Sequence, residues 1–177
     1  ESIELIRGPE TLVYGSNTVA GIINILSPIY KQKKLDNSKF KLLMGHESSN
    51  QSNLLSANIN IPLKSYQIFT NYTKRTARDQ SSPLGDLKNT ALMKDDFTFA
   101  ITKFGQKNYT TLQIKDFAMD YGIPGSPEGH IDGVDLKLKN LSQKLFYHGD
   151  INFSSFKFLE LEQCYIKYGH QEFVKDA

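Results

Sequence analysis

The feature that most constrains the fold is an alternation of apolar and polar residues in short stretches that end at turn-forming residues. In LSANINI, residues 55–61, apolar side chains alternate with Ser56, Asn58 and Asn60. Successive side chains of a β-strand point to opposite faces, so this period of two predicts a strand with one apolar and one polar face. The stretch FKLLMGHE, residues 40–47, has a similar pattern. The chain is therefore expected to form a sheet whose two faces meet different surroundings.

Similar stretches recur after Pro28, each ended by Gly, Pro, Asn, Ser or Asp. They predict about seven strands, at 40–47, 55–61, 66–74, 97–104, 109–121, 134–147 and 156–169. After the first hairpin the connections alternate between short and long: PLKS, ARDQSSPLGDLKNTALMKD, GQK and GIPGSPEGHIDG. Short turns on one side and long loops on the other are typical of outer-membrane β-barrels. The strand pattern alone is equally compatible with an antiparallel β-sandwich.

Composition narrows the classes of function. No run approaches the roughly 18 apolar residues of a membrane-spanning helix. The net charge of +2, without clustered Lys and Arg, argues against nucleic acid as a partner. Cys164 is the only cysteine, so neither an intramolecular disulfide nor a thiolate metal cluster is expected. No Ser/His/Asp or paired-acid grouping stands out, and we expect neither an enzyme nor a cofactor.

The opening segment ELIRGPETLVYGSNTVAGIINIL, residues 4–26, has a different texture, apolar and punctuated by glycine. Gly8 and Pro9 predict a turn, because proline has a fixed φ and no backbone donor. Gly15 and Gly21 allow a positive φ or a close backbone approach, and GIINIL predicts a buried strand. A phosphate-binding glycine loop is disfavoured, because no Lys-Ser or Lys-Thr pair follows the glycines.

This segment resembles the end of the plug domain of TonB-dependent outer-membrane receptors. The family's run is IE-x-(I/L)-RGP-x-x-x-LYG-x-x-(A)-x-GG-x-(I/V)-N-(I/V), and here Val13 replaces the usual Leu and Ala20 the first Gly of the pair. The matching motif residues are Arg7, Gly8, Pro9, Tyr14, Gly15, Gly21 and Asn24. The resemblance implies that 1–28 is the C-terminal part of an α+β plug domain. It implies that 29–177 forms the N-terminal strands of a transmembrane β-barrel.

The fold class expected from this resemblance is all-β, an antiparallel up-and-down meander. Barrels of plugged transporters have about 22 strands, so about seven can form only part of the wall, and the chain is expected to be a fragment of a longer receptor. In this family the plug joins the barrel on the periplasmic side, so the strand at 40–47 is expected to run outward. The connections that contain Ser82 and Ser126 then lie outside the cell, and the one that contains Ser65 faces the periplasm.

The resemblance also implies a function and partners. Receptors of this family lie in the outer membrane of Gram-negative bacteria, contact outer-membrane lipid, and import a scarce nutrient into the periplasm. A TonB-type energy-transducing protein drives this import through a segment N-terminal to the residues present here. The family's plug arginine lies against carboxylates of the barrel wall, so Arg7 is expected to hold the plug in place. The alternative for Arg7 is a position at a helix end or in a loop, exposed in the periplasm.

Two later segments resemble the zinc-uptake branch of the same family. DYGIPGSPEGHIDGVDLKLKNLSQKL, residues 120–145, is similar to an extracellular loop and the strand after it, and LEQCYIKYGHQEF, residues 161–173, to a later strand end. Asp120 replaces an Asn and Cys164 a Gly of that pattern. The expected substrate is a metal ion or a metal chelate, with zinc the favoured ion and the metal itself left open.

Zinc takes three or four nitrogen, sulfur or carboxylate ligands. The candidate ligands in the extracellular loops and strand ends are His130, Glu128, Asp132, His170 and Glu172. A single histidine in a polar loop is more often solvated than bound to a metal. Aromatic residues near strand ends suit an interfacial girdle, although aromatic side chains are common in any strand. These girdle candidates are Tyr66, Tyr72, Phe97, Tyr147 and Tyr168.

Overall fold

The computed structural model describes residues 2–9, 11, 21–26, 33–127 and 129–175. The chain divides into two compact units, Glu1–Lys33 and Lys34–Ala177. The predicted domain boundary after residue 28 lies outside the described residues. No helix in the described ranges is long and apolar enough to cross a membrane.

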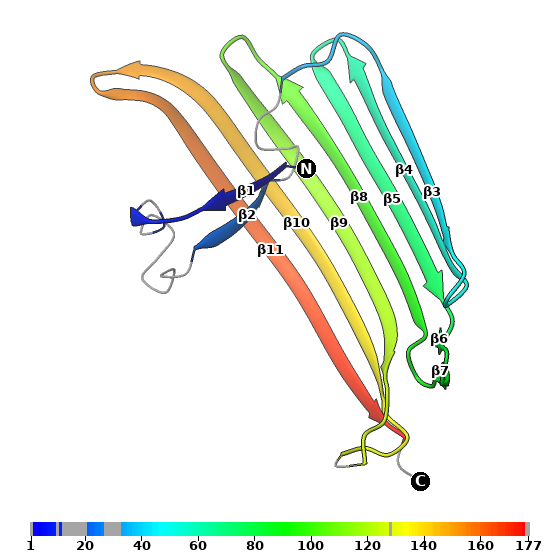
Figure 1. Cartoon of the computed structure of the whole chain (residues 1–177). Coiled ribbons are helices and arrows are strands. Elements are labelled where there is room, and N and C mark those ends of the chain that lie inside the picture. The colour runs from blue at the N-terminus through cyan, green and yellow to red at the C-terminus, as the bar shows by residue number, and fades with distance from the viewer. Residues whose placement is uncertain (1, 10, 12–20, 27–32, 128, 176–177) are drawn as a thin grey trace. The chain divides into compact units, whose positions relative to one another are not determined.

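The first unit contains a two-stranded antiparallel sheet (Figure 1). Strand β1, Ser2–Ile6, pairs with β2, Ile22–Leu26, so the predicted strand in GIINIL is confirmed. The prediction that this strand is buried is wrong for Ile23, whose surface is 68% exposed. A two-stranded ribbon has no second layer of its own to cover both faces, which explains this exposure.

The second unit contains a seven-stranded antiparallel sheet in the order β11-β10-β9-β8-β5-β4-β3 (Figure 1). All seven predicted strands are present, and most extend beyond the predicted ends. Their bounds are β3 Lys39–Glu47, β4 Ser52–Leu63, β5 Tyr66–Ala77, β8 Leu92–Phe104, β9 Asn108–Ile123, β10 Val134–Phe153 and β11 Phe156–Val174. A short hairpin, β6 Gln80–Ser82 with β7 Gly85–Leu87, lies in the long connection predicted as a loop. The predicted all-β antiparallel meander is confirmed.

The connections have different lengths at the two ends of this sheet (Figure 1). The turn 48–51 and the connections 78–91 and 124–133 lie at one end, which we call the loop end. The two-residue turns 64–65 and 154–155 and the turn 105–107 lie at the other, the turn end. Long connections thus share one end, as the sequence predicts.

The register aligns side chains of one character across the strands. Ala57 pairs with Tyr72, which pairs with Phe97, while the neighbouring Asn58 pairs with Asn71. Because side chains alternate along each strand, these pairs belong to opposite faces. On β4, β5, β8, β9 and β10 the apolar face includes Leu55, Ile59, Ile61, Ile68, Tyr72, Phe97, Phe99, Ile101, Leu112, Ile114, Leu141 and Leu145. The polar face includes Ser56, Asn58, Asn71, Thr73, Asp96, Thr98, Thr102, Thr111, Gln113, Lys115, Asn140 and Lys144.

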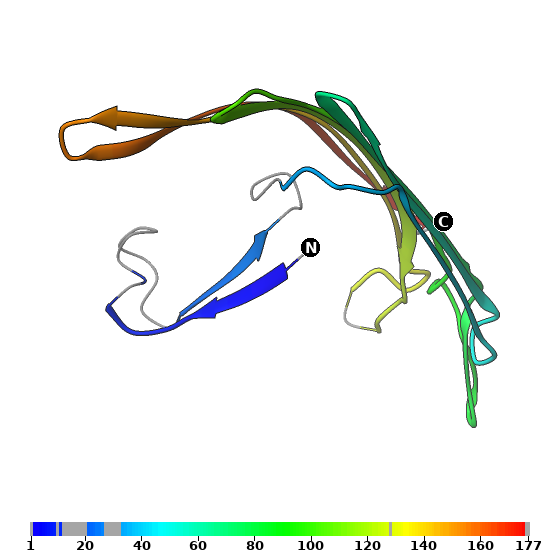
Figure 2. The same cartoon turned by 90° about the horizontal axis from the view of Figure 1, so that it is seen from above.

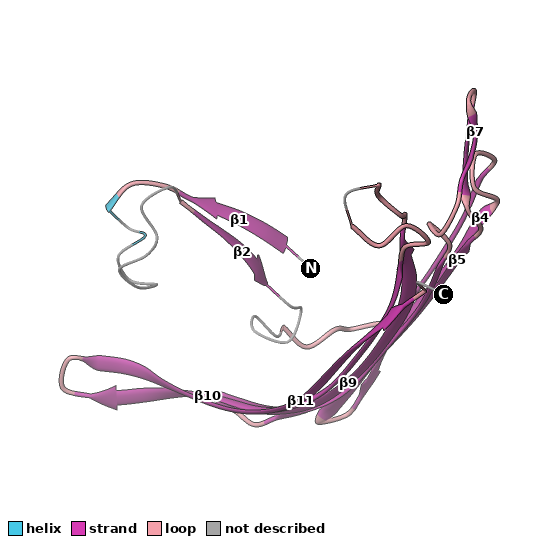
Figure 3. Ribbon diagram, turned by 90° about the horizontal axis from the view of Figure 1, so that it is seen from below, coloured by secondary structure: helices cyan, strands magenta, loops and turns pink. Residues whose placement is uncertain are grey.

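The sheet is curved, as the views along its edge show (Figures 2 and 3). Its buried side chains all belong to the polar face: Ser52, Gln67, Thr98, Ala100, Thr102, Thr111, Gln113, Leu136 and Phe146. Side chains crowd together on the inner side of a curved sheet, so this burial indicates that the sheet curves toward its polar face. The apolar face is the outer one and leaves Met44 and Tyr165, among others, more than half exposed.

The register also sorts the girdle candidates. Tyr66, Tyr72, Phe97 and Tyr147 lie on the apolar face. Tyr168 pairs with Asn140 and lies on the polar face, so its assignment to an outer girdle is wrong. The strand period explains the difference, since a side chain one position away from an apolar-face residue points to the opposite side.

Candidate functional site

The plug-like motif forms a tight turn at the end of β1. The Thr11 backbone N–H donates to the Gly8 carbonyl at 3.1 Å, and the Thr11 hydroxyl donates to the same oxygen at 2.8 Å. Gly8 has φ +83° and Gly21 has φ +117°, a region that favours glycine. A Cβ on Gly21 would also lie 3.1 Å from the Ile6 carbonyl oxygen. These values explain the glycines at both positions.

Of the remaining motif residues, Arg7 and Asn24 lie within the described ranges. Arg7 is exposed, and its predicted wall partners stay a prediction. Asn24 belongs to β2. Tyr14 and Gly15 lie outside the described residues.

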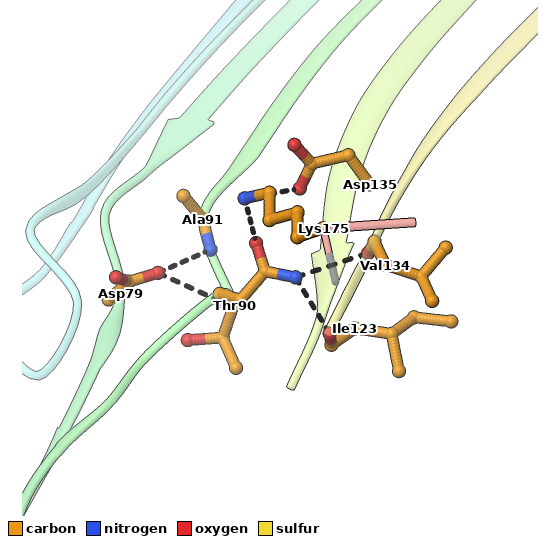
Figure 4. A network of polar contacts seen from close by, with 8 residues as sticks. Asp79, Thr90, Ala91, Ile123, Val134, Asp135 and Lys175 are labelled. Carbon is orange, nitrogen blue, oxygen red and sulfur yellow. Dashed lines mark hydrogen bonds and ion pairs between the residues drawn. The ribbon is translucent and has the colours of Figure 1, made fainter. Parts of the chain in front are cut away.

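The loop end of the seven-stranded sheet holds a network of polar contacts centred on Asn89. Figure 4 labels its partners Ile123, Val134 and Lys175. The Asn89 side-chain amide donates to the carbonyl oxygens of Ile123, at 2.7 Å, and Val134, at 3.2 Å. The Lys175 ammonium donates to the Asn89 amide oxygen at 2.8 Å and pairs with the Asp135 carboxylate at 2.9 Å. One residue of the 78–91 connection therefore joins both sides of the 124–133 loop and the end of β11.

A carboxylate caps the segment next to Asn89. The backbone N–H groups of Thr90 and Ala91 donate to Asp79 Oδ1 at 2.8 and 2.9 Å (Figure 4). These donors, Thr90 first, hold the pKa of Asp79 below its usual range. The Thr90 hydroxyl in turn accepts from the Gln80 N–H at 2.8 Å. Asp79 thus fixes the backbone from which the Asn89 side chain projects.

An open groove of about 760 Å³ runs beside this network. Apolar and charged groups line it together, so it offers both a hydrophobic surface and ionic partners. Its charged and polar lining includes Asp79, Lys88, Asn89, Asp120, Tyr121, Asp132, Asp135, Lys137 and Lys175. Of the predicted ligand residues, Asp132 contributes to this groove.

The structure brings together two of the predicted metal ligands, His170 and Glu172. His130 and Asp132 are exposed in the 124–133 loop, where the His130 carbonyl accepts from the N–H groups of Ser126 and Gly133, each at 3.1 Å. His170 lies on the polar face of β11, with its Nε2 3.4 Å from Glu172 Oε1. Glu128 lies outside the described residues. Within the described ranges no three His, Cys, Asp or Glu side chains are grouped so as to hold a metal ion.

Two other histidines have defined partners. His46 Nδ1 lies 3.0 Å from Asn53 Oδ1 at the loop end. At the turn end, His148 Nδ1 lies 2.9 Å from Glu160 Oε1, and its ring stacks 5.2 Å from that of Tyr109. The partners of both histidines belong to neighbouring strands of the sheet.

Sequence reasoning did not identify Asn89 or Lys175. Asn89 is one of many polar residues in a long connection, and Lys175 follows the last predicted strand by several positions. The positive φ of Asn89, +60°, suits asparagine better than most residues, but this preference alone does not indicate a cross-loop contact. Only the pairing of β8, β9, β10 and β11 brings these two residues together.

No family model matches the chain. A stretch of 84 residues is 32% identical to the probable TonB-dependent siderophore receptor PirA of Acinetobacter baumannii. This similarity supports the expected resemblance to TonB-dependent receptors. The aligned stretch covers 45% of this chain and 11% of that relative, so the chain spans a small part of the receptor that it resembles.

Proposed function

We propose that this chain forms part of the barrel wall, and the end of the plug, of a TonB-dependent receptor in the outer membrane of a Gram-negative bacterium. The receptor binds a metal ion or a metal chelate outside the cell and imports it into the periplasm. The observation that carries this proposal is the single curved sheet with an apolar outer face and a polar inner face. A barrel exposed to lipid on the outside and to a polar lumen inside needs this arrangement. The sequence similarity to a siderophore receptor supports the same family.

The height of the apolar face supports insertion in a bilayer. On β8 this face is bounded by Lys103 near the turn end and Asp95 near the loop end, eight positions apart. At about 3.4 Å per residue these positions are roughly 27 Å apart along the strand. A tilt of about 40° reduces this to roughly 21 Å, close to the apolar band of about 25 Å on outer-membrane barrels. On β8, charged side chains therefore border a band of suitable thickness, whereas on the neighbouring β9 Asp116, opposite Phe97, brings the charged border one row closer to the middle.

The alternative is a soluble β-sandwich binding module. A sandwich buries the apolar faces of two stacked sheets against each other. In the part of the chain that the structure describes, all seven long strands belong to one sheet, and its apolar face is the exposed one. We therefore favour the barrel. Expression of the chain without detergent separates the two, because a barrel segment aggregates in water and a sandwich gives a folded monomer.

The experiment that tests the function is uptake by cells that carry the full-length receptor. We expect accumulation of zinc or of an iron chelate that requires both the receptor and the energy-transducing protein. A deletion of the receptor that leaves uptake of each substrate unchanged contradicts the proposal. Cells without the energy-transducing protein are the control for passive leakage through the barrel.

A substitution of His130, which lies exposed in the 124–133 loop, tests whether the substrate is a bare metal ion or a chelate. If the receptor takes zinc, His130→Ala weakens zinc binding by about tenfold or more, as loss of one ligand commonly does. The matched control is His46→Ala, a histidine at the same end of the sheet that contacts Asn53. Titration calorimetry of the full-length receptor with zinc measures the effect. Equal affinities for wild type and His130→Ala favour a chelate, which aromatic and basic loop residues would recognise.

A further inference from the structure

We propose that the connections at the loop end form one mechanically coupled layer, and that Asn89 is the positioning residue that holds the 124–133 loop within it. The proposal rests on the proposed function only for the consequence that this layer is the part of the sheet that faces the ligand. Its structural content is independent of the substrate.

The coupling begins at the first hairpin. The Arg78 backbone N–H donates to the Asn50 carbonyl, and the Ser81 N–H to the Ser49 carbonyl, both at 2.8 Å. The turn 48–51 is thus hydrogen-bonded to the connection 78–91, which is distant from it in the sequence. These bonds are outside the regular ladder between β4 and β5.

The second step joins the two long connections. Asn89 donates to the carbonyls of Ile123 and Val134, which are the residues immediately before and after the 124–133 loop. The Gly122 N–H also donates to the Ala91 carbonyl at 3.1 Å. We call Ile123 and Val134 the neck of this loop. Because the Asn89 side chain bonds to both residues, it holds the two sides of the neck together.

The third step extends the layer to β11. The Lys175 N–H donates to the Gly133 carbonyl at 3.3 Å, and the Lys175 ammonium contacts Asn89 and Asp135. Lys175, the residue directly after β11, therefore contacts the same neck. Hydrogen bonds thus link the turn 48–51, the connection 78–91, both ends of the 124–133 loop and Lys175.

Glycines leave room for this junction. A Cβ on Gly122 would lie 2.5 Å from the Asn89 carbonyl oxygen, and a Cβ on Gly133 would lie 2.6 Å from the Asn89 side-chain nitrogen. Gly133 also has φ +85°, which a residue with a side chain rarely adopts. The backbone of the neck approaches Asn89 so closely that only glycine fits on both sides.

The test is hydrogen–deuterium exchange of the full-length receptor in detergent micelles without substrate. The variant is Asn89→Asp, because aspartate tolerates a positive φ and keeps an acceptor for Lys175 but loses the two amide donors. We expect backbone amides of the 124–133 loop to exchange about five- to tenfold faster, the effect of losing one or two exposed hydrogen bonds. The matched control is Asn108→Asp, the same chemical change at the start of β9, which lies at the turn end and outside the layer.

Amides of β9 and β10 are measured in the same experiment as a check on folding. Faster loop exchange with unchanged strand exchange supports the proposal. Loop exchange equal to that of the wild type overturns it. If strand exchange also rises, Gly133→Ala provides the second variant, and its effect must not add to that of Asn89→Asp, because both act on one neck. Full additivity overturns the proposal. Failure of metal uptake would contradict the proposed function and leave this result untouched.

Discussion

Thr102 and Thr111 are almost inaccessible to solvent, with 2% and 0% of their surface exposed, and both lie on the polar face. Their hydroxyls are 2.9 Å apart and bond to each other across β8 and β9. Buried hydroxyls without a partner are costly, whereas a paired set costs little. Each hydroxyl therefore satisfies the other at this position of the polar face.

This pairing predicts a non-additive mutant cycle. Thr102→Val alone leaves the Thr111 hydroxyl buried and unbonded, and we expect a loss of about 1–3 kcal/mol in the free energy of unfolding. Thr102→Val with Thr111→Val removes both polar groups and should be near neutral. Guanidinium unfolding of the full-length receptor in lipid vesicles measures both. A double variant that loses the sum of the two single effects contradicts this account.

Asp79 gives a prediction of pH dependence. Because the Thr90 and Ala91 donors lower the pKa of Asp79 from its ordinary value of 3.8, the carboxylate stabilises the loop above that value. This stabilisation is lost as the pH falls through the lower pKa of the folded state. The backbone amide signals of Thr90 and Ala91, followed by NMR between about pH 6 and pH 2, should move with this titration.

The variant that tests the assignment is Asp79→Asn, which removes the titrating group and should abolish this movement. Asp132→Asn, in the neighbouring loop, is the control and should leave it unchanged. Amide signals that titrate in the same way without the Asp79 carboxylate would rule out the assignment.

At the scale of the strands, the position of a residue along the apolar face determines which substitutions a membrane tolerates. On β9, Ile114 pairs with Phe99 and Gln143 in the middle of the apolar band. Thr110 belongs to the same face but pairs with Lys103 at the border. The same strand therefore offers a central and a peripheral position on one face.

We expect Ile114→Arg to cost about 2–4 kcal/mol of stability in a bilayer, because a charge at the midplane of the membrane is poorly solvated. Thr110→Arg should cost about 0–1 kcal/mol, because its guanidinium reaches the interface. Unfolding of both variants in vesicles provides the comparison. Equal costs at the two positions would show that the apolar face does not meet lipid.

For the molecule as a whole, the decisive asymmetry is between the loop end and the turn end. Ser82 and Ser126 belong to long connections at the loop end, and Ser65 lies in a two-residue turn at the turn end. If the loop end faces the outside of the cell, these positions differ in access to reagents that do not cross the membrane. The single native cysteine, Cys164, belongs to β11.

In a Cys164→Ser background, we expect Ser82→Cys and Ser126→Cys to react with an impermeant thiol reagent on intact cells. Ser65→Cys should react only after the outer membrane is permeabilised. Gel electrophoresis of the labelled receptor gives the result. The reverse pattern would invert the proposed orientation.

The sequence by itself determined the local features of this protein. Alternation in stretches such as 55–61 located the strands, and Gly, Asn and Ser located the turns, because side-chain direction and turn geometry depend on neighbouring residues. A turn at Gly8 and Pro9 and a backbone at Gly21 that can take a positive φ follow from the residue types; the structure shows that Gly21 does take φ +117°.

Only the tertiary structure decided the register, the ends of the strands and the contacts between loops. A shift of one residue in pairing would exchange the two faces, and no local pattern specifies which residue of β5 lies opposite Phe97. The β6–β7 hairpin is held by a hydrogen bond from the Ser81 N–H to the Ser49 carbonyl, in a turn that is distant in the sequence. Asn89 and Lys175 stand 86 positions apart and meet because the antiparallel strands between them bring both residues to the loop end. Such contacts arise from the geometry of the whole sheet, which is why sequence reasoning placed the loops correctly but not the residue that joins them.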